Sequence, residues 1–143
     1  QPGVFSVSSP DGWPIADYLL MNECAPCVTV EMAYHADRAE FNLFSADPDA
    51  FQAYTSALLS RFYALGGEYL GVLYSRDSNI PFVVLRATDA SGTFYYAETM
   101  ARGWAIGLRC YAYNDATFTA YRALTGDEYR LFEQMIVSFS PIR

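Results

Sequence analysis

Two cysteines separated by two residues, Cys24 and Cys27 in the stretch NECAPCVTVE, have the spacing that most directly suggests chemistry. A Cys-x-x-Cys pair exchanges disulfides when its first thiolate is stabilised at a helix N-terminus. Here the acidic Glu23 precedes the pair, and a neighbouring negative charge raises a thiol pKa. The residues that follow, VTVEM, favour a strand, which removes the helix dipole that would stabilise a thiolate. The pattern therefore favours a disulfide or inert thiols in a turn, with a redox pair as the alternative.

A metal site would draw on the same two cysteines together with His35 and Asp37. A structural zinc site takes four Cys or His ligands, and this chain has three cysteines and a single histidine. Cys110 could complete such a set only if the fold brought it close to the pair. It lies in an apolar alternation that predicts a small core residue instead. We therefore expect no metal and no cofactor.

Tyrosine is in surplus, with 12 in the chain, and several of them fall in regions that are predicted to be strands. A buried tyrosine hydroxyl needs a hydrogen-bond partner, so they are not all expected in the central core. The plain interpretation is a sheet with amphipathic residues at its margins. The functional interpretation is an aromatic contact surface for a protein, peptide or glycan partner, since tyrosine and arginine are frequent at binding hot spots. The candidate residues of such a surface are Tyr95, Arg109, Tyr111 and Tyr113.

Composition excludes several classes of function. Nine basic residues, all of them arginine, stand against 16 acidic ones, which gives a net charge of −7. An acidic chain repels phosphate backbones, so nucleic acid is not an expected partner. Without lysine the chain can form neither a Schiff base nor a P-loop. Because no catalytic set of residues emerges either, we predict that the protein is not an enzyme.

No apolar run approaches the roughly 18 residues that a membrane-spanning helix needs, so we expect no transmembrane segment. The chain begins at Gln1 without a methionine, which is what the removal of an export signal would leave. A lipid anchor upstream is compatible with the same observation.

The order of apolar and turn residues predicts two helices around a series of strands. Asp47 and Pro48 can begin a helix that ends at Gly66, while Thr125 and Glu128 form a capping box that begins a second. Short connections between the central strands allow only hairpins, so this part should be an antiparallel meander. A further helical turn is expected within residues 114–124. The expected strands cover residues 4–8, 27–34, 40–46, 68–76, 80–88, 92–101 and 104–113.

The alternation of side chains predicts how the sheet is covered. In the last central strand, one face carries apolar residues and the other carries Arg109, Tyr111 and Tyr113. Arg86 and Glu98 are expected on neighbouring strands, joined by a cross-strand ion pair. A sheet with two largely apolar faces needs helices on both sides, which indicates a layered α+β domain. At 143 residues the chain is long enough for one such domain.

Four features in this order resemble the PsbP-like family. The opening GVFSVSSPDGWPI is similar to the family's f-s-v-x-x-P-x-G-W start, and a helix that ends near Gly-Gly follows. Consecutive hairpin strands come next and close with GWAIGLRCYAY. The final helix ends in FEQMIVSFSP, which is the closest match. The resemblance spans residues 1–143 and rests on structural residues rather than on a catalytic motif.

The resemblance implies a three-layer α/β/α sandwich around a mainly antiparallel sheet. The family includes a photosystem II extrinsic subunit, a nuclear-import factor that binds a small GTPase, and many bacterial envelope lipoproteins. It has no shared catalytic residues to carry over. It therefore implies a non-enzymatic binding or interaction module at the bacterial cell envelope, either secreted or lipid-anchored. The alternative function is a thiol–disulfide oxidoreductase that uses Cys24 and Cys27.

Overall fold

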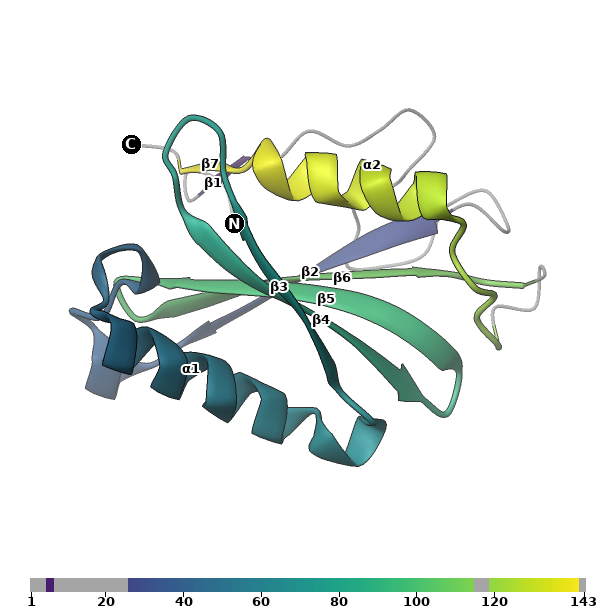
Figure 1. Ribbon diagram of the computed structural model, residues 1–143, viewed down its shortest axis with the longest axis horizontal. Coiled ribbons are helices and arrows are strands. Elements are labelled where there is room, and N and C mark those ends of the chain that lie inside the picture. Colours follow the sequence, from purple (N-terminus) through teal and green to yellow (C-terminus); the bar gives the residue numbers. More distant parts are fainter. Residues whose placement is uncertain (1–4, 7–25, 115–118, 142–143) are drawn as a thin grey trace.

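A five-stranded antiparallel sheet is the centre of the molecule in the computed structural model, which describes residues 5–6, 26–114 and 119–141 (Figure 1). Four of its strands follow one another as hairpins, and the fifth comes from earlier in the chain and pairs with the last of them. The expected meander and the α+β class are therefore confirmed. In spatial order the strands are β2 (Pro26–Tyr34), β6 (Trp104–Ala112), β5 (Gly92–Ala101), β4 (Pro81–Asp89) and β3 (Glu68–Tyr74).

A short second sheet joins the two ends of the chain. Its strands, β1 (Phe5–Ser6) and β7 (Ser140–Pro141), pair antiparallel. The strand expected over residues 4–8 is thus described only at residues 5–6. The rest of the opening motif, and Cys24 with it, lies outside the described residues.

Both helices begin at the predicted caps. Helix α1 (Pro48–Arg61) starts after Asp47, whose Oδ1 accepts a hydrogen bond from the Ala50 amide at 2.8 Å. Helix α2 (Gly126–Val137) starts after Thr125 with a complete capping box: the Thr125 hydroxyl accepts from the Glu128 amide, and the Glu128 carboxylate accepts from the Thr125 amide. These bonds satisfy amides that the first helical turn leaves without an intrahelical partner.

The two helices cover opposite faces of the sheet, here named the α1 face and the α2 face (Figure 1). Successive side chains along each strand point alternately to the two faces, so the apolar residues form two separate clusters. The cluster on the α1 face contains Tyr54, Leu58, Phe62, Phe94 and Tyr96. The cluster on the α2 face contains Phe132, Met135, Ile136, Phe82, Val84 and Leu108.

One expected element is wrong, and another, the helical turn within residues 114–124, is described only at residues 114 and 119–124. Residues 40–46 do not form a strand: Leu43–Ser45 is a 3₁₀ turn, η2, and only Asn42 makes an isolated bridge, to Ala101. The Asn42 side chain also accepts a hydrogen bond from the Arg102 amide, so this segment is held as a cap on the β5–β6 hairpin. The expected turn of helix within residues 114–124 is also not formed at residues 119–124, where Tyr121 bridges to Tyr113.

Gly107 on β6 is required by the packing of the α1 face. It lies between Glu31 of β2 and Glu98 of β5 in one row across the sheet. A Cβ atom at this position would lie 2.1 Å from the Tyr96 hydroxyl oxygen and 2.6 Å from the ring carbon that carries it. The Tyr96 ring therefore occupies the space that a side chain at position 107 would fill.

Replacing Gly107 with Ala should lower the free energy of unfolding by about 1–3 kcal/mol, because the Tyr96 ring must move to admit the methyl group. Urea denaturation measures the change. Gly126→Ala at the start of α2 is the matched control, since its nearest new contact is a flexible Arg130 nitrogen at 3.8 Å. A Gly107→Ala protein as stable as the control would contradict this account of the packing.

Candidate functional site

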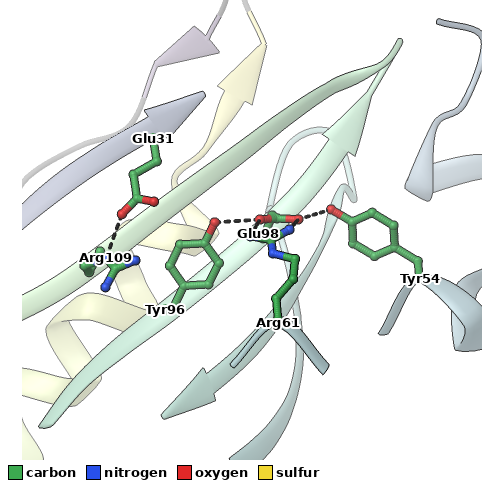
Figure 2. A network of polar contacts seen from close by, with 6 residues as sticks. All are labelled: Glu31, Tyr54, Arg61, Tyr96, Glu98 and Arg109. Carbon is green, nitrogen blue, oxygen red and sulfur yellow. Dashed lines mark hydrogen bonds and ion pairs between the residues drawn. The ribbon is translucent and has the colours of Figure 1, made fainter. Parts of the chain in front are cut away.

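A carboxylate, Glu98 on β5, is buried on the α1 face and is fully engaged by four donors. Arg61 approaches it with both terminal nitrogens, at 3.0 Å from Nη2 to Oε1 and 3.3 Å from Nη1 to Oε2. The Tyr96 hydroxyl donates to Oε1 at 2.5 Å, and the Tyr54 hydroxyl donates to Oε2 (Figure 2). We call these four residues the carboxylate clamp.

Local structure brings the clamp together from two elements. Tyr54 and Arg61 are seven residues apart on α1, which is close to two helical turns and places them on the same side of the helix. Tyr96 and Glu98 are two residues apart on β5 and therefore share a face of the strand. The clamp thus joins one side of α1 to the centre of the sheet.

The electrostatics of the clamp keep both phenols protonated. Burial raises the pKa of Tyr54 and of Tyr96 well above the ordinary value, and the negative charge of Glu98 raises both further. The Arg61 side chain is 54% exposed, so the positive charge that balances Glu98 reaches solvent. Because both phenol hydroxyl groups and both terminal nitrogens of Arg61 bond the Glu98 carboxylate, this arrangement is suited to holding α1 in place.

The pairing of Glu98 was not the one expected from the sequence. Arg86 does lie on the neighbouring strand β4, but it faces Tyr95 across the sheet and forms its ion pair with Glu68 of β3. Arg86 and Glu98 lie on opposite faces, because Glu98 is in register with Val83, three residues from Arg86. The predicted Arg86–Glu98 ion pair is therefore wrong.

Arg109 on β6 lies beside the clamp on the same face, with its guanidinium over aromatic rings. Its Cζ is 4.4 Å from the centre of the Phe94 ring and 5.6 Å from that of Tyr96. Its Nε donates to Glu31 Oε2 at 2.6 Å (Figure 2). The side chain is 24% exposed, and no hydrogen bond within the described residues uses Nη1 or Nη2. The guanidinium is therefore fixed in position while its outer donors remain available.

Three tyrosines cluster next to Arg109. Tyr111 stacks on Tyr121 with ring centres 4.9 Å apart, and Tyr113 contacts both rings at 5.5 Å. The Tyr111 hydroxyl shares a 3.0 Å hydrogen bond with Thr29, which is in register with Arg109. We call this area the arginine–tyrosine surface, and its residues are Thr29, Glu31, Arg109, Tyr111, Tyr113 and Tyr121. Tyr111 is buried and supports the other five, which are partly exposed.

Of the four residues proposed for a contact surface, the structure brings three together. Arg109, Tyr111 and Tyr113 share the α1 face, as their alternation predicted. Tyr95 lies on the α2 face, where its ring packs against Tyr129 of α2 at 4.6 Å. Tyr95 is therefore a packing residue and not part of the arginine–tyrosine surface.

The described cysteines do not form a reactive or metal-binding group. Cys27 and Cys110 are buried free thiols that belong to the α1-face and the α2-face cluster respectively, so the sheet separates them. Burial raises the pKa of both thiols. His35 is eight residues further along than Cys27, and most of that distance is the extended strand β2, which separates the two by about 26 Å. The metal set of Cys27, His35 and Asp37 is thus not assembled, and among the described residues no group of three or more His, Cys, Asp or Glu could hold a metal ion.

No protein-family model, curated protein or solved structure matches this chain. In the part of the chain that the structure describes, no helix is long and apolar enough to cross a membrane. The function of the site is therefore inferred from its own geometry.

The two buried phenols of the clamp should make the free energy of unfolding fall at alkaline pH. The pKa of Tyr54 and of Tyr96 is raised by folding, so their contribution is complete below the unfolded value of about 10 and is lost as the pH rises above it. We expect urea denaturation to show a free energy of unfolding that falls above about pH 10. In the Tyr54→Phe protein the slope of the free energy of unfolding against pH should be smaller by up to about 1.4 kcal/mol per pH unit, because unfolding then releases one proton fewer. Equal slopes in the two proteins would contradict the assigned protonation.

Proposed function

We propose that this chain is a PsbP-like domain, a three-layer α/β/α sandwich, that acts as a non-enzymatic binding module at the bacterial cell envelope. The order of its sequence motifs supports the family, and a helix on each side of an antiparallel sheet supports the sandwich. The extracytoplasmic location, secreted or lipid-anchored, belongs to the same proposal and rests on the resemblance. The function is argued from the arginine–tyrosine surface.

The observation that carries the binding role is the state of Arg109. An arginine at a binding hot spot is effective when its side chain is held in the binding geometry beforehand, because little conformational entropy is then lost. Arg109 meets this condition through its stacking on Phe94 and its bond to Glu31, and its outer donors have no partner among the described residues. The neighbouring tyrosines add the rigid, amphipathic contact area that protein interfaces favour.

The chemistry of the surface favours a protein or peptide partner over a glycan. The planar Nη edge of a guanidinium fits a carboxylate or a main-chain carbonyl group. Thr29 adds a hydroxyl group and Glu31 adds an acceptor beside it. We therefore expect the partner to present a carboxylate or an exposed carbonyl group to Arg109, with an apolar side chain against Tyr113.

A photoreactive phenylalanine at position 113 should crosslink the domain to a discrete partner in the cells that produce it. Arg109→Ala should then weaken binding of the purified partner at least about tenfold, as expected when a hot-spot arginine is truncated. Calorimetric titration measures the affinity, and thermal unfolding checks that the variant folds. Arg130→Ala is the control, because Arg130 is an exposed arginine on α2 at the opposite face. Equal affinities of the two variants, or turnover of a substrate by the domain, would contradict the proposal.

The alternative, a dithiol oxidoreductase, depends on the reactivity of Cys24 and Cys27. Cys27 is buried in β2 and its pKa is raised, which is unfavourable for a resolving thiol. In a Cys24→Ser protein we expect Cys27 and Cys110 to react with a disulfide reagent only in denaturant. A native thiol that reacts quickly, with a pKa well below about 8.5, would support the oxidoreductase instead. Cys110→Ser is the matched variant. It retains only Cys24 and Cys27, so any fast reaction that persists in it belongs to that pair.

A further inference from the structure

The outermost strand β3 (Glu68–Tyr74) presents an unpaired edge. It pairs with β4 on one side, and no strand formed by the described residues pairs with its other side. Natural edge strands are usually protected by lysine, proline, inward-pointing charges or bulges, because a free edge is a template for another strand. From Tyr69 to Tyr74 this strand reads YLGVLY and contains no lysine, proline or charged residue. A bulge at Leu70 interrupts its first part, whereas Gly71–Tyr74 pairs regularly with β4 and has no such protection.

Most of the exposed large apolar side chains of the described residues lie in β3 or in the turn that precedes it. Among the described residues six large hydrophobic side chains are exposed, and four of them belong to β3 or to the turn that leads into it. Tyr63 is 84% exposed and Tyr74 is 51% exposed. Isolated exposed hydrophobic residues are normal on a protein surface, whereas a group of them along a free edge indicates an interface. The four residues are Tyr63, Tyr69, Leu70 and Tyr74.

We infer that β3 is the interface of a symmetric dimer, in which two copies of this chain join their sheets edge to edge. The pairing is antiparallel, with a twofold axis at Val72, so that each Val72 faces its counterpart. Leu70 of each copy then faces Tyr74 of the other, which brings the exposed side chains of the two edges together. The inference concerns the opposite edge of the sheet from β2 and is independent of the proposed binding function.

Charge complementarity favours a second copy of the chain as the partner that pairs with this edge. A pairing centred on Val72 brings Glu68 of one copy to the same end as Arg76 of the other, and the twofold axis repeats this contact. Arg76 lies in the turn that follows β3, where its amide donates to the Val137 carbonyl group. Its side chain is exposed and makes no hydrogen bond or ion pair within the described residues. Glu68 is half-exposed beside Arg86 and can accept from a second guanidinium. The edge is thus complementary to itself in both its apolar and its charged groups.

The purified protein should have twice the 16.0 kDa chain mass in sedimentation equilibrium at micromolar concentrations. Tyr74→Lys should return it to the monomer mass, because two lysines would enter the apolar contact, and far-ultraviolet circular dichroism should show an unchanged fold. Phe44→Lys is the control, since Phe44 is as exposed as Tyr74 but lies in η2, away from this edge. A wild-type monomer, or a dimer that Tyr74→Lys leaves intact, would overturn the inference.

A charge exchange tests the register of the two strands. Arg76→Glu should weaken the dimer about tenfold or more by placing two carboxylates at each end of the pairing. The double variant Glu68→Arg/Arg76→Glu should restore most of the lost affinity, since opposite charges meet again. Sedimentation velocity over a concentration series gives the dissociation constants. If the double variant is as weak as Arg76→Glu alone, the pairing centred on Val72 is wrong.

Discussion

A single buried carboxylate constrains the packing of the α1 face. An isolated ionised carboxyl group in an apolar layer costs several kcal/mol, so Glu98 can be accommodated only where every oxygen has a partner. The sheet itself supplies one donor, Tyr96, and the others come from Tyr54 and Arg61 of α1. Apolar packing alone would leave a helix some freedom to rotate or slide on a sheet. The two-turn spacing of Tyr54 and Arg61 fixes both the rotation and the position of α1.

The same constraint prepares the arginine–tyrosine surface. The Tyr96 ring lies over Gly107, where its hydroxyl group reaches Glu98 and its face contributes to the aromatic surroundings of Arg109. Phe62, the residue after Arg61, lies 5.9 Å from the Arg109 guanidinium as well. The clamp therefore contacts the candidate binding surface, because Tyr96 of the clamp lies beside Arg109 of the surface. Any rearrangement of α1 would release Arg109 from part of its aromatic support, which couples the rigidity of the fold to the geometry of the surface.

Local features were predictable from the sequence and long-range pairings were not. The caps of both helices and the hairpin strands depend on residues a few positions apart, and the structure has them where the sequence predicts. The carboxylate clamp escaped prediction because Glu98 and Arg61 meet only through the docking of α1, 37 residues earlier in the chain. A signal was present: Glu98 occupies an inward position in the alternation Phe94, Tyr96, Glu98, Met100, where a charge needs a partner. The same alternation places Tyr95 on the opposite face of β5 from Tyr96 and Glu98, and therefore away from Arg109.

The exclusive use of arginine as the basic residue has a physical explanation in these contacts. Arg61 forms a bidentate pair with Glu98, and Arg109 and Arg38 lie over the rings of Phe94 and Phe41. A planar guanidinium can make both kinds of contact, whereas a lysine ammonium group cannot form the fork and is more strongly hydrated. Several of the arginines of this acidic chain thus form ion pairs with its own carboxylates. Within the part of the chain that the structure describes, the outer donors of Arg109 and the side chain of Arg76 have no partner. These two positions coincide with the two surfaces through which the domain is proposed to make contacts.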